Sequence, residues 1–396
     1  MNSVNVYHQC GHNEVWNLGI FAHDSVGDGF IFGPRMRSTK AQIINFDNKI
    51  KEISFFDPQF YQPRSELKKF TDYDFFPKIV CYDEYSTKDF SEMSHISAER
   101  CIDFQLDQNF KFIIIPAVTY NDIPKSYLES LKELYIEPFL LAANKRELNE
   151  RKILLTVVIK DSQLFDTEYM DELLNLITSY VEITGIYLVP SFRFSGKRFK
   201  DIGVISNLLE FIHMLKLNEM YVHLAYCDIE GLLYSIAGID SVSIGTYENT
   251  RRFDLNNFEK PDGKPKAQPN RRIYSNKLLQ WIDFNYIEAL KEYDSFNNLF
   301  ELNRHISLSI PKVKDWHFKF PELYRHFMMS IYNQYKSLPN NYNERFEMLH
   351  ILFEDAINYN KEIADNRILF DSNSDGSHLS AWLTALNRFD KFVGIR

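Results

Sequence analysis

The feature that most constrains the fold is a series of short apolar runs that alternate with longer segments of helical periodicity. Most of these runs are continuously apolar, which is typical of strands buried on both faces of a parallel sheet. Their alternation with helical segments favours repeated βα units. We predict eight strands, at 29–34, 53–57, 112–118, 153–159, 186–190, 221–226, 241–245 and 271–275, with 78–83 as an additional candidate.

The segments between the runs carry apolar residues at helical spacing. Met170, Leu173, Leu174 and Ile177 follow one another at intervals of three, one and three, so they form a single stripe on one helix face. In the unit that begins at 228, we expect Asp228 to cap a short helix and Gly238 to end it. Further helices are predicted around 39–51, 87–103, 125–147 and 205–212.

Eight such units between about residues 29 and 290 match the usual size of a (β/α)8 barrel, about 250 residues. An open, doubly wound sheet is the alternative. That fold binds dinucleotides through a glycine-rich turn after its first strand, and the sequence "FGPRMRS" at 32–38 has no GxGxxG pattern. We therefore predict a TIM-type barrel over residues 1–290. Residues 291–396 read as a C-terminal helical region that caps the barrel or forms an interface.

Composition indicates where such a protein works. The net charge is −9, and the four cysteines are scattered without a CxxC pair, which is typical of a reducing compartment. The first residues have neither the basic nor the apolar part of a signal peptide. No apolar run reaches the roughly 20 residues that span a bilayer. We expect a cytoplasmic protein with no membrane partner.

Basic residues follow several predicted strands, although the chain as a whole is acidic. Residues 249–272 alone contain seven Lys or Arg and three Asp or Glu. In a parallel barrel these loops meet on one face, where barrel enzymes keep their active sites. They would form a mouth that attracts an anion such as a nucleotide or a nucleic acid, although ordinary polar loops also contain such residues. The predicted anion-binding residues are Arg35, Arg193, Lys197, Arg198, Arg251 and Arg252.

Carboxylates stand at the ends of the same strands. Asp57 lies among aromatic residues in "FFDPQFY", Asp161 follows the strand at 153–159, and Glu248 follows the strand at 241–245. Converging carboxylates can share the roles of nucleophile, general acid and general base, and they can also hold Mg²⁺. We predict these three as catalytic residues and expect no redox cofactor. For Asp228 we favour the capping role over a chemical one.

Two segments resemble the tRNA-guanine transglycosylase barrel family. "EGLLYSIAGIDSVSIGTYENTRR" is similar to a late βα unit of that family that runs into a "TR" loop, and "EISFFDPQFYQ" is similar to its strand with an aspartate before a "GGFQ" turn. The resemblance implies that Asp57 is an acid or base near a nucleobase, and that Thr250 and Arg251 face RNA and substrate. This chain has Ser243 where the family has its nucleophilic aspartate, and it has no cysteine-rich zinc site.

Two functions are consistent with these features. The first is a barrel enzyme that transfers or hydrolyses a glycosidic bond in a nucleotide or nucleic acid, which requires two carboxylates. A metal-dependent phosphoesterase or glycosidase using the same carboxylates is a variant of this hypothesis. The second is a non-catalytic subunit on a degenerate barrel, which binds nucleic acid, or a protein through its C-terminal helices.

Overall fold

The computed structural model describes residues 1–62, 67–76, 87–193, 197–260, 271–293, 296–310 and 321–394; for residues 87–92 it describes the backbone alone. The candidate strand at 78–83 lies outside these residues. So does the stretch 261–270 of the predicted basic loop.

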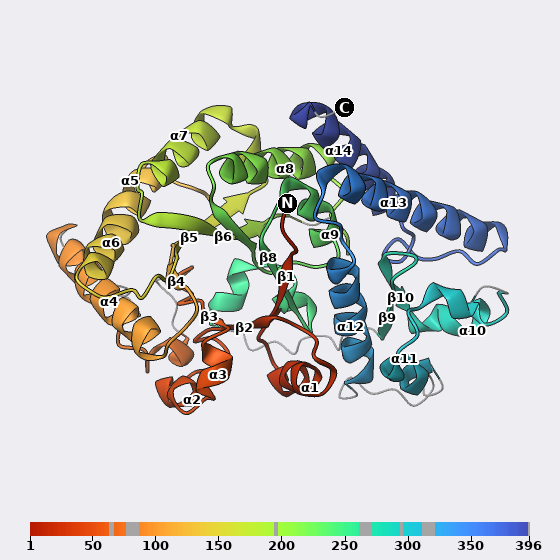
Figure 1. Cartoon of the computed structure of the whole chain (residues 1–396), viewed down its shortest axis with the longest axis horizontal. Coiled ribbons are helices and arrows are strands. Elements are labelled where there is room, and N and C mark those ends of the chain that lie inside the picture. The colour runs from red at the N-terminus through yellow and green to blue at the C-terminus, as the bar shows by residue number, and fades with distance from the viewer. Residues whose placement is uncertain are drawn as a thin grey trace.

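Eight parallel strands form one sheet that curls into a nearly closed barrel (Figure 1). The order around the barrel is β3-β2-β1-β8-β7-β6-β5-β4, and every adjacent pair in this order is parallel. The predicted (β/α)8 barrel is therefore confirmed. The strands are β1 (Asn5–Gln9), β2 (Gly29–Phe32), β3 (Phe55–Phe56), β4 (Ile113–Ile115), β5 (Ile153–Lys160), β6 (Ile183–Ser191), β7 (Tyr221–Leu224) and β8 (Ser241–Gly245).

Two strand assignments made from the sequence were wrong. The first barrel strand is β1, which was not predicted because three of the five residues in "NVYHQ" are polar and they form no apolar run. The predicted eighth strand is β9 (Arg272–Ser275), and it pairs in antiparallel fashion with β10 (Gln280–Asp283) to form a separate hairpin. An apolar run indicates that a strand is buried, but it does not identify the strand's partner.

Helices connect the strands and cover the outside of the barrel. Gly238 ends the unit after β7 as predicted, in the left-handed conformation at φ 91° that favours glycine. The helices within the barrel are α1 (Glu14–Asp24), α2 (Lys40–Ile44), α3 (Asn48–Lys51), α4 (Thr87–Asp107), α5 (Tyr127–Leu131), α6 (Glu137–Asn144), α7 (Thr167–Thr178), α8 (Ile202–Leu217) and α9 (Gly231–Tyr234), with a π-helical turn at Lys132–Ile136 between α5 and α6.

The barrel has a seam between β3 and β4, which do not pair as a strand ladder. Among the described residues, backbone hydrogen bonds join the two sides above and below it, from Lys111 N to Ser54 O and from Thr119 N to Tyr61 O, both 3.0 Å long. The side chain of Gln105 on α4 takes the place of a neighbouring strand. Its Oε1 accepts from Ile114 N at 2.8 Å, and its Nε2 donates to Ile114 O at 3.1 Å. The edge of β4 is thereby satisfied without a backbone partner.

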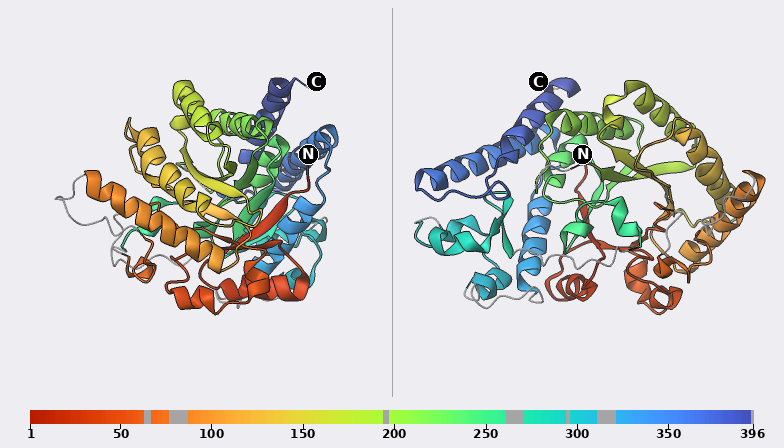
Figure 2. Two further views of the ribbon diagram at one scale, coloured as in Figure 1. Left: turned by 60° about the vertical axis from the view of Figure 1, so that its left-hand side comes forward. Right: turned by 180° about the vertical axis from the view of Figure 1, so that it is seen from behind.

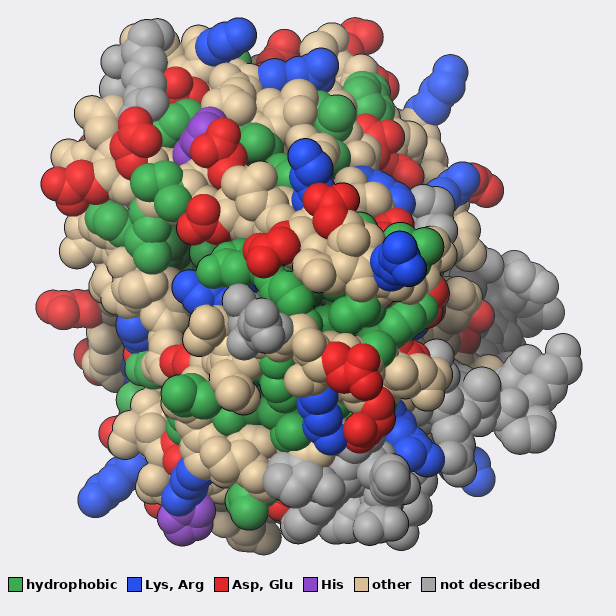
Figure 3. All heavy atoms as spheres, turned by 90° about the vertical axis from the view of Figure 1, so that its right-hand side faces the viewer, with side chains coloured by type: hydrophobic (Ala, Val, Ile, Leu, Met, Phe, Trp, Pro, Cys, Tyr) green, Lys and Arg blue, Asp and Glu red, His purple; other side chains and the backbone are tan. Residues whose placement is uncertain are grey.

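The C-terminal region lies against one side of the barrel in all the ribbon views (Figure 2). It includes α10 (Ile287–Leu290), α11 (Arg304–Ser309), α12 (Glu322–Lys336), α13 (Tyr342–Asp365) and α14 (His378–Val393). The helices α12, α13 and α14 confirm the predicted C-terminal helical region. Helix α14 packs on α8 of the barrel. On the surface of this side, acidic, basic and apolar side chains are intermixed (Figure 3).

None of the helices in the described ranges is both long enough and apolar enough to cross a membrane.

Candidate active site at the barrel mouth

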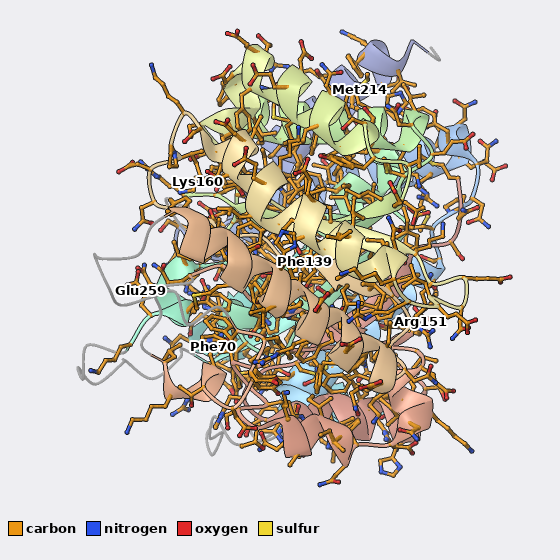
Figure 4. All side chains as sticks on the ribbon, turned by 90° about the vertical axis from the view of Figure 1, so that its left-hand side faces the viewer. Phe70, Phe139, Arg151, Lys160, Met214 and Glu259 are labelled. Carbon is orange, nitrogen blue, oxygen red and sulfur yellow. The ribbon has the colours of Figure 1, made fainter. Side chains whose placement is uncertain are left out.

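A pocket of about 590 Å³ opens where the strands end, on the face where barrel enzymes carry their chemistry. Its walls come from the segments that follow β4, β5, β6 and β8. Lys160, the last residue of β5, lies on the same side of the molecule as Glu259, whereas Arg151, just before β5, lies on the opposite side (Figure 4). The volume is within the range that holds small-molecule ligands, about 300 to 1,000 Å³.

The pocket wall carries both signs of charge and an apolar surface. Four of its side chains are acidic (Asp122, Asp161, Glu248 and Asp254) and three are basic (Lys160, Arg193 and Arg252). Phe192 and Phe253 supply ring surface, and several amide side chains lie beside them. The pocket is therefore not a purely cationic mouth. It suits a ligand that combines an anionic group, hydroxyl or amino groups, and an apolar ring.

Glu248 is held between two cations. Its Oε2 is 2.6 Å from Lys197 Nζ, and its Oε1 is 3.0 Å from Arg252 Nη1. Partial burial acts to raise the pKa of Glu248, but the hydrogen bond from Lys197 and the charges of Arg252, Lys197 and Arg251 outweigh it, so the pKa is lowered. Glu248 thus remains ionised at neutral pH, as a base, a nucleophile or an electrostatic partner requires.

Arg198 and Arg251 lie below the mouth, paired with Asp228. The Asp228 Oδ2 atom is 2.7 Å from Arg198 Nη1 and 3.3 Å from Arg251 Nε, and all three side chains are buried. The predicted capping role of Asp228 was therefore wrong, since α9 begins after Glu230. The guanidinium of Arg251 also lies 4.4 Å from the centre of the Trp281 ring, which is on the β10 strand. These two arginines join the barrel to the hairpin beside it.

Asp57 is buried just beyond the end of β3, with 1% of its surface exposed. Its Oδ1 accepts from Gln59 N and its Oδ2 accepts from Tyr61 OH, both at 2.9 Å. Burial raises the pKa of Asp57 to about 7, and the hydrogen bond from Tyr61 opposes that shift only in part. A carboxyl with this pKa can both hold and release a proton near neutral pH.

A polar cluster surrounds Asp57. The Tyr187 and Tyr226 hydroxyls are near enough to lower its pKa, although the Tyr187 hydroxyl makes no hydrogen bond of standard geometry with any described residue. The Gln59 amide lies 3.4 Å from Tyr226 OH. Gln59 and Tyr226 both adopt positive φ, 59° and 52°, which non-glycine residues rarely do. Such strained residues concentrate at functional sites.

Two phenylalanines separate Asp57 from the pocket. Phe253 packs against Tyr61 and Tyr226, with ring centres 4.8 and 5.5 Å apart, and Phe258 packs against Tyr61 at 5.0 Å. Phe253 also lines the pocket, so it forms a partition between the pocket and the Asp57 cluster. Both rings belong to the segment after β8.

The structure thus groups the predicted residues by depth. Asp161, Arg193, Glu248 and Arg252 line the pocket, and Lys197 is tied to it through Glu248. Asp57 lies behind the phenylalanine partition. Arg35 lies beside this partition, and the Arg35 guanidinium is 5.5 Å from the centre of the Phe258 ring. Sequence reasoning missed the tyrosines around Asp57, because a tyrosine next to a strand has the pattern of a core residue.

The described part of the chain has no group of three or more His, Cys, Asp or Glu side chains arranged to hold a metal ion. In "HQCGH", His8 and Cys10 are buried, and the His8 Nε2 atom is 2.7 Å from Val26 O. His223 lies in the barrel core, with Nδ1 2.7 Å from Ser241 Oγ.

The fold and the pocket together define a (β/α)8 barrel protein with a charged pocket at the carboxyl ends of its strands. Comparison of the chain with models of protein families, with curated proteins and with solved structures found no match.

Proposed function

We propose that this chain is a barrel enzyme that transfers or hydrolyses the glycosidic bond of a nucleotide or of a nucleotide within a nucleic acid. The observation that carries the proposal is the mouth pocket, in which Asp161, Glu248, Arg193 and Arg252 converge from separate βα loops. The arginines would hold phosphate, the carboxylates would bind ribose hydroxyls or the reacting carbon, and the phenylalanines would stack on the base.

The chemistry needs one carboxyl that gives a proton and one that stays charged. Asp57 and Glu248 have environments that push their pKa values apart, since burial raises that of Asp57 and cations lower that of Glu248. This separation is the usual basis for dividing acid and base roles between two carboxyl groups. On this proposal Asp57 protonates the leaving base, and Glu248 or Asp161 stabilises the positive charge that develops on the sugar.

Release or exchange of the free base from nucleotides and RNA, measured by liquid chromatography and mass spectrometry, tests the proposal. Glu248→Gln and Asp161→Asn should each lower the rate, with the residue that faces the sugar causing a loss of about 10²-fold or more. Asp171→Asn, on the exposed face of α7, is the control and should leave the rate unchanged. Full activity in both folded pocket variants would contradict the residue assignment. The absence of any base release by the wild type would contradict the reaction.

A non-catalytic binding subunit is the second candidate, and the phenylalanine partition over Asp57 favours it. If Phe253 never leaves Tyr61 and Tyr226, the buried carboxyl cannot reach a ligand in the pocket. A stoichiometric protein partner that persists at high salt, together with no turnover of any nucleotide, would support this candidate. A bound polynucleotide that dissociates with salt would instead support the charged pocket as its site.

A further inference from the structure

A chain of polar side chains runs through the barrel from the end opposite the pocket. It begins at Lys111, which is exposed and precedes β4. Lys111 Nζ donates to Tyr7 OH at 2.9 Å, and the Tyr7 and Tyr221 hydroxyls are near enough to shift each other's pKa. Tyr221 OH donates to Ser241 Oγ at 2.8 Å. These groups lead from solvent into the barrel.

The next groups lead toward Asp57. Ser241 Oγ is 2.7 Å from His223 Nδ1, and the His223 ring stacks on Tyr187 with ring centres 5.0 Å apart and an interplanar angle of 17°. The Tyr187 hydroxyl is close enough to Asp57 to influence its pKa. Among the described residues, no hydrogen bond connects His223 Nε2 with the Tyr187 hydroxyl.

Three buried polar atoms belong to neighbouring side chains at this gap, and none of them makes a hydrogen bond of standard geometry with a described residue. They are His223 Nε2, Tyr187 OH and Thr156 Oγ1, and all three side chains are 0% exposed. The strand register places them next to one another, since Tyr187 is paired with Thr156 on one side and with His223 on the other. Buried polar atoms are almost always satisfied, commonly by an internal water with two to four polar partners.

We propose that one water molecule bound between Thr156, Tyr187 and His223 completes a proton path from Lys111 to Asp57. Ser241 accepts from Tyr221 and donates to His223 Nδ1, which leaves the His223 proton on Nε2, directed at the water. The water donates to Tyr187, and Tyr187 donates to Asp57. In a transfer, each O–H or N–H bond breaks as the next one forms. The Asp57 carboxylate gains a proton, and solvent restores the one that Lys111 loses.

The path gives the buried carboxyl a route to solvent that does not cross the pocket. Phe253 and Phe258 cover the mouth side of the Asp57 cluster. The titratable groups near Asp57 are Tyr61, Tyr187 and Tyr226, together with the buried Cys101 thiol, whose pKa the Asp57 charge helps to raise. The catalytic meaning of the path rests on the proposed role of Asp57, whereas the path itself does not depend on any substrate.

Hydrogen exchange of the Asp57 carboxyl, followed by infrared spectroscopy after transfer to D₂O, tests the path. Near pH 5 the group is protonated, because its pKa is about 7, and Asp57→Asn identifies its C=O band. Thr156→Val and Tyr187→Phe should each slow the exchange, on the order of tenfold or more. Ser206→Ala, which removes a buried hydroxyl without a described partner on α8 outside the barrel, should leave it unchanged.

Unchanged exchange in both folded variants would overturn the path. Faster exchange in Phe253→Ala, with no effect of Thr156→Val or Tyr187→Phe, would assign proton entry to the mouth and would equally overturn it. Should Thr156→Val not fold, Thr156→Ser keeps the hydroxyl and should exchange like the wild type, and Tyr187→Phe then decides. Since no nucleotide is present, a negative result leaves the proposed enzymatic reaction untouched.

Discussion

Two aspartates of this chain show how much the local environment decides the behaviour of one residue type. Asp228 and Asp57 are both almost fully buried. Burial acts to raise the pKa of Asp228, but the charges of Arg198 and Arg251 overcome it and lower the pKa. Among the described residues Asp57 has no ion-pair partner and is hydrogen-bonded by neutral groups, so its pKa rises to about 7. Asp228 is therefore held as an anion, whereas the raised pKa lets Asp57 hold a proton near neutral pH.

The raised pKa of Asp57 predicts a stability cost at alkaline pH. The folded protein holds this proton up to about pH 7, whereas the unfolded chain releases it near pH 3.8. Stability contributed by the protonated group is therefore present below pH 3.8 and is lost as pH rises to about 7. Asp57→Asn removes this loss. The free energy of unfolding of Asp57→Asn relative to wild type should rise between pH 4 and pH 8, by roughly 4 kcal/mol at most.

Urea unfolding of both proteins across this pH range measures the difference. A difference that does not change with pH would show that Asp57 has the same pKa in the folded and unfolded chains. A difference that falls with rising pH would show that an undetected cation partner stabilises the carboxylate. Asp161→Asn, at the pocket wall, provides the comparison for a carboxyl outside the buried cluster.

At the level of elements, one side chain satisfies the edge of β4 at the seam with β3. Gln105 supplies the donor and the acceptor that a neighbouring strand would give to Ile114. Gln105→Leu keeps a similar size but leaves the Ile114 N–H and C=O unpaired in the core. Because each of the two buried unpaired groups costs about 1 to 3 kcal/mol, the variant should lose roughly 2 to 6 kcal/mol of unfolding free energy.

Chemical denaturation of Gln105→Leu checks this expectation. Ile96→Leu, on the exposed side of the same helix, is the control and should change stability by no more than about 0.5 kcal/mol. A loss equal to that of the control would mean that β4 finds other partners, for instance by pairing directly with β3. Backbone amide exchange at Ile114 would then remain slow in the variant.

The elements themselves were largely readable from the sequence, and their partners were not. The long apolar strands at residues 153–160 and 183–191 can be identified from the sequence pattern alone. The helices α7, α8, α12 and α14 can be identified in the same way. The polar residues of β1 concealed a strand in the interior of the sheet. At the site, strand ends predicted the loops that meet at the pocket. The sequence does not show which arginines line the pocket. Arg198 and Arg252 have the same local sequence pattern, but Arg252 lines the pocket and Arg198 does not.

At the scale of the whole molecule, the C-terminal region stabilises the barrel and the loops of the site. The Arg345 side chain on α13 is fully buried and donates to Ser235 O at 2.8 Å and to Asn2 O at 2.9 Å, at the amino-terminal side of the barrel. Trp382 Nε1 on α14 donates to Phe199 O at 2.9 Å. Phe199 belongs to the segment that supplies Lys197 and Arg198, so α14 holds one wall of the mouth in place.

We therefore expect the full chain to unfold in one cooperative transition, with coincident curves from circular dichroism and from tryptophan fluorescence. The segment 1–290 alone should lose this cooperativity, because truncation exposes the apolar face of α8 against which α14 packs. A sharp transition of the 1–290 segment at the temperature of the full chain would contradict this expectation. It would establish the barrel as an independent domain.

The phenylalanine partition has a kinetic consequence. A ligand that reaches Asp57 must first expel the Phe253 ring from its contacts with Tyr61 and Tyr226. Exposing such a side chain costs about 1.5 to 3 kcal/mol, so the measured affinity would be weaker than the intrinsic one by roughly 10- to 100-fold. The observed association rate would then level off at high ligand concentration, because the rotation of the Phe253 ring, and not diffusion, would limit it.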